Sequence, residues 1–409
     1  MTQPNTSDPE KPKEAKLPRR DWVLLPLLGL LTICLMVVSL ELIAGRMFSE
    51  SPSSLSSCYG PLDPETGRRA IPNSVCWDKV LESSLVEYKF NSCGYRGGIE
   101  CGPKSASTYR IVMIGTSFAQ GGAVQQENTF AALLPSNISR QTGRKIELYN
   151  EGNFSVHPHG FALRMNEVLA AEPDAILWIL TPHDVEEELP DAVLHNPRRD
   201  QSSLLARVWF RIKATFASKS ILDTVHELWQ NQLWKIKKTA TATLLLHFLY
   251  ESRSQYLKSY LAAGDSAGFL RVQPSAKWQN RLVHFESDAT EIERRAKAAG
   301  VPLMVTLVPN RAQAAMISMG EWPAGYDPYK LNDELRSIIV RHGGVYIDIL
   351  PDYRNIANPE QGYFPVDGHP NADGHATISK LLAKKLTSGA VPALRVTTMP
   401  QLSSSKPER

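Results

Sequence analysis

Residues 109–118, YRIVMIGTSF, decide the fold. The apolar run 109–114 predicts a buried β-strand that ends at Gly115, and a short polar turn containing Ser117 follows it. Apolar runs and helix-like stretches alternate after this turn; the expected strands are 146–149, 175–180, 303–308 and 345–349, and the expected helices are 160–171, 289–299, 329–341 and 373–386. Such alternation is typical of an open parallel sheet with helices on both faces. We therefore expect an α/β fold, a three-layer α/β/α sandwich around a central parallel sheet.

The composition fits a packed globular protein with one large domain or two. The chain has 409 residues, of which 43% are hydrophobic and 21% are charged. Lys and Arg number 45 against 42 Asp and Glu, and no block of basic residues occurs, so a nucleic-acid partner is not expected. A long stretch at about 189–280 interrupts the alternation with a helical pattern. We expect it to be an inserted helical cap or lid, and a surface lying on a bilayer is the alternative.

A membrane segment precedes the globular part. Residues 22–40 form a run of nineteen residues without a charge, which as a helix would span about 28 Å, close to the ~30 Å of a bilayer core. We expect an uncleaved signal anchor with one transmembrane helix, and a cleaved signal peptide is the alternative. Five basic residues precede the run, whereas Arg46 alone follows it within twenty residues. This asymmetry predicts a cytoplasmic N-terminus and a periplasmic or extracellular main domain.

The cysteines agree with export. Four of the five lie after the apolar run, at Cys58, Cys76, Cys93 and Cys101. An oxidising compartment permits disulfides, and the spacing favours Cys58–Cys76 and Cys93–Cys101 among the three possible pairings. A metal site is the weaker alternative, because no CxxC pair occurs. The expected order is a cytoplasmic tail, a signal anchor, a cysteine-containing stalk or lead-in, the α/β domain and a flexible tail, at 1–20, 21–45, 46–108, 109–388 and 389–409.

Residues able to perform acyl transfer follow the predicted strands. Ligands of an open α/β sheet sit at the carboxyl ends of its strands, and Ser117 follows the first of them. A serine hydroxyl becomes a good nucleophile when an imidazole accepts its proton and a carboxylate orients that imidazole. His369 and Asp367, beyond the last strand, supply these two groups. The backbone amides of Ser117 and Gly152 are the expected donors to an oxyanion.

These motifs resemble those of the SGNH (GDSL-type) hydrolases, in particular membrane-anchored bacterial members. The similar segments are 115–121, 150–152, 367–375 and the lead-in 90–97, and the resemblance covers about 87–388. It implies a three-layer sandwich that removes or transfers acyl groups, with the catalytic acid and base in the last motif. Anchored, exported members often act on acetylated polysaccharides. The resemblance implies no metal and no organic cofactor.

Two positions depart from the family pattern. Thr116 stands where the family usually has Asp, in a role that supports the turn. His183 occupies the position of an Asn whose side chain donates to the oxyanion. The His183 imidazole could donate to the oxyanion instead, or Asn153 could be the donor. Loss of one such donor costs about 10²–10³ in rate.

The sequence therefore predicts an exported, membrane-anchored serine esterase or acyltransferase. Its expected partners are an acylated carbohydrate or small ester, as substrate, and the lipid bilayer, through residues 22–40. A first alternative is a catalytically weakened SGNH scaffold that binds carbohydrate or organises an envelope assembly, which His183 motivates. A second is an α/β domain of another kind, although no Walker or dinucleotide-binding glycine motif occurs. The pattern specifies neither the acyl group nor an oligomeric state.

Overall fold

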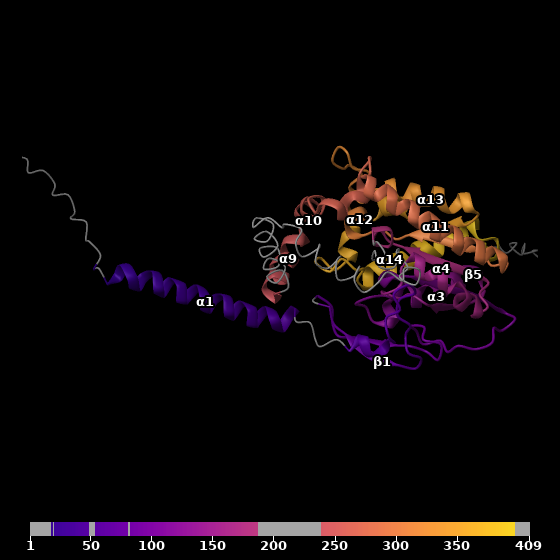
Figure 1. Ribbon diagram of the computed structural model, residues 1–409, viewed down its shortest axis with the longest axis horizontal. Coiled ribbons are helices and arrows are strands. Elements are labelled where there is room, and N and C mark those ends of the chain that lie inside the picture. Colours follow the sequence, from indigo (N-terminus) through magenta and orange to yellow (C-terminus); the bar gives the residue numbers. More distant parts are fainter. Residues whose placement is uncertain (1–17, 19, 49–53, 81, 187–238, 397–409) are drawn as a thin grey trace, which may run out of the picture.

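The computed structural model describes residues 18, 20–48, 54–80, 82–186 and 239–396, and a sheet of five parallel strands lies at its centre (Figure 1). The strand order is β4-β3-β5-β6-β7, and every neighbouring pair is parallel. The bounds are Thr108–Gly115 (β3), Lys145–Asn150 (β4), Ala175–Leu180 (β5), Leu303–Leu307 (β6) and Val345–Tyr346 (β7). The predicted α/β fold with a parallel sheet is confirmed.

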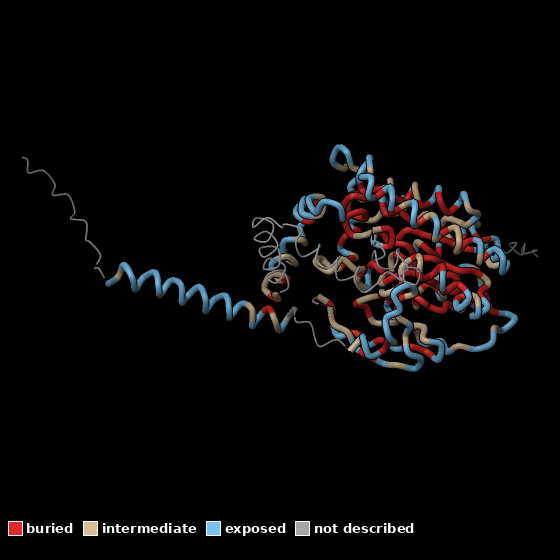
Figure 2. Tube along the Cα trace, in the orientation of Figure 1, coloured by how far each residue is buried: buried red, intermediate tan, exposed pale blue. Residues whose placement is uncertain are grey.

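Helices cover both faces of this sheet. Every residue of β3 and β5 is buried, as expected of continuous apolar strands enclosed from two sides. One group of helices comprises α3 (Phe130–Thr142) and α14 (Ala372–Lys385), which pack on each other. The other comprises α4 (Pro158–Ala170), α11 (Ala276–Ala298) and α13 (Lys330–His342). Figure 2 shows the buried core between these layers.

Two element boundaries differ from the prediction by more than two residues. Helix α11 begins at Ala276 instead of 289, because Ser275 caps it and the buried Trp278 and Phe285 extend its apolar stripe. Strand β7 has two residues instead of five, since the chain passes into a 3₁₀ helix at Leu350–Asn355 soon after it. Helices α3 and α12 (Arg311–Met319) had not been predicted.

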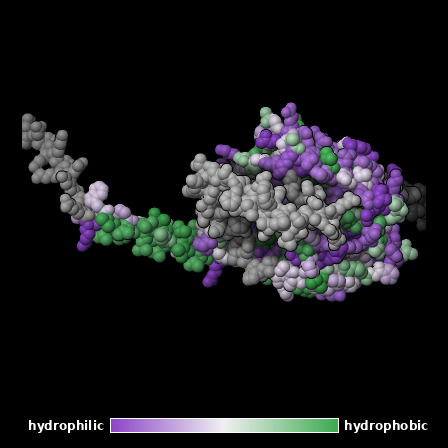
Figure 3. Space-filling view, in the orientation of Figure 1, coloured by the Kyte–Doolittle hydropathy of each residue, from purple (hydrophilic) through white to green (hydrophobic). Residues whose placement is uncertain are grey.

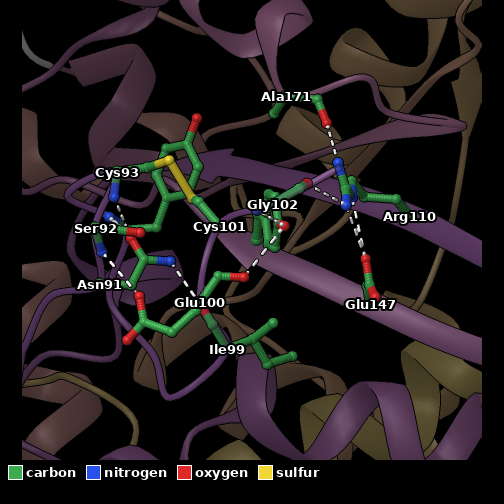
Figure 4. The surroundings of a disulfide bond; sticks show 12 residues. Asn91, Ser92, Cys93, Ile99, Glu100, Cys101, Gly102, Arg110, Glu147 and Ala171 are labelled. Atoms are coloured by element: carbon green, nitrogen blue, oxygen red, sulfur yellow. Dashed lines mark hydrogen bonds and ion pairs between the residues drawn. A yellow bond between two sulfur atoms is a disulfide. The ribbon is translucent and has the colours of Figure 1, made fainter. Parts of the chain in front are cut away.

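The cysteine-containing lead-in packs on the α/β domain. Its strands β1 (Val75–Asp78) and β2 (Val86–Lys89) form an antiparallel pair. Disulfides join Cys58 to Cys76 and Cys93 to Cys101, which are the sequence-local pairs. Figure 4 shows how the second disulfide region is fastened to the sheet: Arg110 of β3 donates to the Gly102 carbonyl at 2.9 Å and forms an ion pair with Glu147 of β4. The segment 54–108 is therefore part of the domain's packing.

The inserted segment and the tail are described in part. Between β5 and β6 the structure contains α9 (Ala240–Glu251) and α10 (Arg253–Leu261), in line with the predicted helical pattern, and the expected cap at 189–238 lies outside the described residues. The tail was expected to be flexible from 389, yet Val391 and Leu394 are buried because they pack on the core. Residues 397–409 lie outside the described part.

Helix α1 (Asp21–Phe48) extends away from the globular domain. Residues 21–46 of this helix are long and apolar enough to cross a membrane. Its large apolar side chains are exposed, and Figure 3 shows them as a hydrophobic band beside the more polar domain surface. This exposure matches the predicted anchor, because a core helix of a soluble protein would be buried.

Candidate active site

Ser117 lies at the first position of a short helix, α2 (Ser117–Gln120), directly after β3. The turn before it requires glycine at 115. Gly115 has φ +146°, and a Cβ at this position would lie 2.5 Å from the Ile179 carbonyl oxygen. Glycine is the residue that tolerates both the conformation and the close approach. The serine is thus presented at the carboxyl end of the sheet, as the sequence predicts.

The loop before α14 brings Asp367 and His369 to this serine. His369 Nε2 lies 2.8 Å from Ser117 Oγ, although 252 positions separate the two residues. His369 Nδ1 lies 2.7 Å from Asp367 Oδ1, and the His369 amide donates to the same oxygen at 3.1 Å. The hydroxyl, the imidazole and the carboxylate therefore form one continuous hydrogen-bonded chain.

The surroundings keep Asp367 ionised and the imidazole in place. Burial by itself would raise the pKa of Asp367, but the hydrogen bonds and positive potential from His369 outweigh it, and the pKa is lowered. The Phe118 ring centroid lies 5.3 Å from that of His369. A Cβ on Gly122 would lie 3.2 Å from His369 Cδ2. Phe118 thus lies beside the ring, and a side chain at position 122 would crowd it.

Arg96 supports the serine turn from the lead-in. Its guanidinium donates to the Gln120 carbonyl at 2.8 Å and to the Val124 carbonyl at 2.7 Å, so it satisfies carbonyl groups where α2 ends. The side chain is buried and stacks on the Tyr88 ring, with Cζ 4.0 Å from the ring centroid. The motif at 90–97 contains Arg96, but this contact was not predicted.

Glu82 holds the loop that carries Asp367 and His369. Its carboxylate accepts hydrogen bonds from the amides of Val366, at 2.8 Å, and Asp367, at 2.9 Å. The other oxygen lies 2.6 Å from Nδ1 of His247 in α9. The Glu82 side chain is 1% exposed. No sequence motif includes this residue, and its role was not predicted.

Gly152, a predicted oxyanion donor, packs directly against α2. A Cβ on Gly152 would lie 2.3 Å from the Gln120 amide nitrogen. Its own amide donates to the Asn150 side-chain oxygen at 2.9 Å, and the Asn150 amide group donates to the Ala119 carbonyl at 2.9 Å. The second predicted segment is thereby joined to the helix of Ser117.

The two other oxyanion candidates make their contacts elsewhere. Asn153 donates to the Arg68 carbonyl at 2.8 Å, and its side-chain oxygen accepts from the Ser155 amide and hydroxyl. The His183 side chain, in α5 (Pro182–Glu186), is 64% exposed, and its Nδ1 lies 3.9 Å from a Glu186 carboxylate oxygen. None of these contacts brings the Asn153 or His183 side chain to the Ser117 hydroxyl.

Asp184, the neighbour of His183, points inward instead. Its buried carboxylate accepts hydrogen bonds from the Thr181 amide at 2.6 Å and hydroxyl at 2.7 Å, and from the Thr116 side chain. Burial raises the pKa of Asp184 overall. Thr116 thereby ties the serine turn to the end of β5.

Glu151, between Asn150 and Gly152, is a buried carboxylate paired with Arg164 at 3.0 Å. Burial raises its pKa from the ordinary 4.5 to about 7, although Arg164 opposes the shift. A carboxyl with a raised folded-state pKa stabilises the fold most below pH 4.5 and loses that stabilisation as the pH rises through about 7. We therefore compare the unfolding free energy of Glu151→Gln with that of the wild type. This difference should rise in favour of the variant by about 3 kcal/mol as the pH increases from 4.5 to 8.

Denaturant unfolding of the full chain in detergent, at pH 4.5 and pH 8, checks this expectation. Glu321→Gln, at an exposed carboxylate, is the matched control and should leave the difference near zero at both pH values. A Glu151→Gln difference that is equal at the two pH values would contradict the assignment of the titration to this buried group.

Comparisons with known proteins give structural neighbours alone. No family model and no curated protein matches the chain. Among similar solved structures are a psychrotrophic esterase from a Pseudoalteromonas species (11% identity, TM-score 0.34, covering 68% of this chain and 96% of that one) and a lipase/acylhydrolase from Enterococcus faecalis (12%, 0.34, 71% and 100%). A third is described as a putative GDSL-like lipase from Parabacteroides merdae (10%, 0.35, 70% and 96%).

Among the described residues, no group of three His, Cys, Asp or Glu side chains is arranged for a metal ion.

Proposed function

We propose that this chain is a membrane-anchored, exported serine ester hydrolase of the SGNH type. One observation carries the proposal: Ser117, His369 and Asp367 form a hydrogen-bonded chain with distances of 2.8 and 2.7 Å. A hydroxyl in contact with a carboxylate-oriented imidazole is the arrangement that activates a serine nucleophile. The motif resemblance supports the same class of reaction.

The reaction would proceed through an acyl-enzyme. His369 Nε2 accepts the Ser117 proton as Oγ attacks the carbonyl carbon of an O-acyl ester. The tetrahedral intermediate collapses, the C–O bond to the alcohol breaks, and His369 returns its proton to the departing oxygen. Water then attacks the acyl-serine, transfers a proton to His369, and releases the carboxylic acid as Ser117 regains its proton. Attack by a sugar hydroxyl in place of water would give acyl transfer.

Asp367 would fix the imidazole tautomer. Its Oδ1 accepts the Nδ1 proton, which leaves Nε2 as the base that faces the serine. Because the pKa of Asp367 is lowered, the carboxylate stabilises the imidazolium that forms during each proton transfer.

The oxyanion would be bound by backbone amides. We assign the Ser117 amide, at the N-terminal end of α2, and the Gly152 amide, which exchanges Asn150 Oδ1 for the substrate oxygen. We do not assign His183, whose side chain is exposed beside Glu186. This exposure favours the second candidate function, a weakly catalytic scaffold that binds carbohydrate, because fewer oxyanion donors mean slower chemistry.

The substrate proposed is a small O-acyl ester or an acylated carbohydrate on the outer side of a membrane. The apolar helix α1 supports the anchor, and the basic residues before it favour a cytoplasmic N-terminus. The disulfides Cys58–Cys76 and Cys93–Cys101 fit an oxidising compartment.

The deciding experiment uses the full chain purified in detergent. Short-chain aryl esters should be hydrolysed, and a fluorophosphonate probe should label Ser117, as mapped by mass spectrometry. Hydrolysis without labelling at Ser117 would refute the assignment of the nucleophile. No hydrolysis and no labelling, together with measurable glycan binding, would establish the scaffold function instead.

Glu82→Ala should lower kcat by about 10²-fold with little change in KM, because the loop bearing Asp367 and His369 loses its two amide contacts and shifts relative to Ser117. Glu82→Gln is the matched variant, since its amide oxygen can still accept from both loop amides. It should retain most of the activity. Steady-state kinetics on an aryl ester test both variants. Equal losses in the two would contradict a positioning role that depends on these accepted hydrogen bonds.

A further inference from the structure

We infer that α9 is an interfacial helix whose exposed apolar face, formed by Leu245, Phe248 and Leu249, lies in the outer surface of the lipid bilayer. The inference rests on the membrane anchor in the proposed function, and it adds a second contact between protein and membrane. The three side chains are 61%, 60% and 46% exposed. At spacings of three and four residues they share one side of the helix.

Helix α9 begins beside α1, just after the uncharged run 22–40 of that helix. Glu41, the first charged residue after the apolar run of α1, accepts hydrogen bonds from the amides of Ala240, at 3.0 Å, and Thr241, at 2.9 Å. Ala44 and Ala240 pack together in a small buried cluster. The first turn of α9 is therefore fixed at the level at which α1 leaves the hydrocarbon region.

The orientation of α9 suits a position on the membrane surface. Figure 1 shows α9 at the side of the globular domain nearest α1, running across the direction of α1. If α1 crosses the bilayer, a helix that runs across it from its outer end lies along the surface. Leu42 and Ile43 of α1, which lie between the contact residues Glu41 and Ala44 in the sequence, are also exposed and apolar.

The opposite side of α9 is committed to the protein. Thr243 is buried, His247 contacts Glu82, and the Tyr250 carbonyl accepts from Arg311 at 2.5 Å. This leaves the side with Leu245, Phe248 and Leu249 to face a partner. Residues 240–250 contain no Lys, Arg, Asp or Glu, whereas lysines at 235, 237 and 238 directly precede them in the sequence. An apolar helix face that follows a short basic cluster in the sequence suits an acyl-chain boundary with anionic headgroups.

The test measures the depth of nitroxide labels on the full chain in nanodiscs that contain phosphatidylglycerol. Cys34, the free and exposed cysteine of α1, reports on the span without any substitution. In a Cys34→Ser background, Phe248→Cys reports on α9, and Leu245→Cys repeats the measurement at a second position. Gln255→Cys, an exposed position of α10, is the matched aqueous control. Each label is assayed by its collision rates with oxygen and with a water-soluble nickel chelate.

The labels at Phe248 and Leu245 should collide with oxygen readily and with the nickel chelate several-fold less often than the Gln255 label, as in a lipid environment. If Cys34 reads lipid while Phe248 and Leu245 read water, the inference fails and the anchor stands. Labels shielded from both reagents would also overturn the inference, because protein, either residues 187–238 or a second copy of the chain, would then cover the face. A Cys34 label that reads water would refute the anchor itself.

Discussion

Ser117→Ala should reduce ester hydrolysis by about 10⁴–10⁶-fold and abolish fluorophosphonate labelling. The hydroxyl is the group in contact with His369 Nε2, at 2.8 Å, and alanine leaves the imidazole with no nucleophile to activate. The remaining rate would come from oxyanion binding and substrate positioning alone. The measurement is kcat/KM on a short-chain aryl ester, with the full chain in detergent and thermal unfolding recorded alongside.

Ser136→Ala provides the matched control for this variant. Ser136 is an exposed serine of α3, and its hydroxyl donates to the Leu133 carbonyl within the same helix. It should hydrolyse esters at the wild-type rate. A Ser117→Ala variant that unfolds at the wild-type temperature and keeps a tenth or more of the activity would show that another residue attacks the ester.

Asp367→Asn should lower kcat by about 10⁴-fold while the fold and the substrate affinity persist. An asparagine keeps the shape of the side chain, but it removes the negative charge that stabilises the imidazolium. Its amide group can also donate to His369 Nδ1, which would place the proton on Nε2 and point it at Ser117. The loop itself should hold, because Glu82 binds the backbone amide of residue 367 and not the side chain.

Asp373→Asn is the control for the loss of a carboxylate near the same loop. Asp373 is exposed in the first turn of α14, close in sequence to the loop of Asp367 and His369 but outside the hydrogen-bonded chain. Kinetics on the same ester should show no more than a small change. A comparable loss in both variants would mean that the negative potential of the region matters, and that Asp367 has no particular role.

The fold was readable from the sequence because its strands are continuous apolar runs. Residues 109–114 and 175–180 are buried on both faces of the sheet. Their unbroken apolar sequence therefore predicts a strand even when the neighbouring strands and helices are unknown. Helix α3 gave a weaker signal, since it contains Pro135, and α11 was recognised from its charged C-terminal half alone. Short β7 depends on pairing with β6, a contact between distant segments.

The candidate site was readable where the chemistry depends on residue type. Ser117, Asp367 and His369 could be proposed because acyl transfer requires those side-chain types, and the structure brings the three together. Glu82 could not be selected, because its contact with the amides of Val366 and Asp367 forms between segments that are distant in the sequence. The position of His183 was likewise set by the turn of α5, which exposes that side chain and buries its neighbour Asp184.

The two cystines have a practical consequence for anyone producing this protein. Arg96, which supports the serine turn, lies in the loop closed by Cys93–Cys101. Glu82, which binds the Asp367 loop, lies between the two disulfides along the chain. Heterologous expression in a reducing cytosol would leave both disulfides unformed. The contacts of Arg96 and Glu82 would then be weakened, although Ser117, His369 and Asp367 are all present. The recombinant protein is therefore best produced through a secretory route, where both disulfides of the lead-in can form.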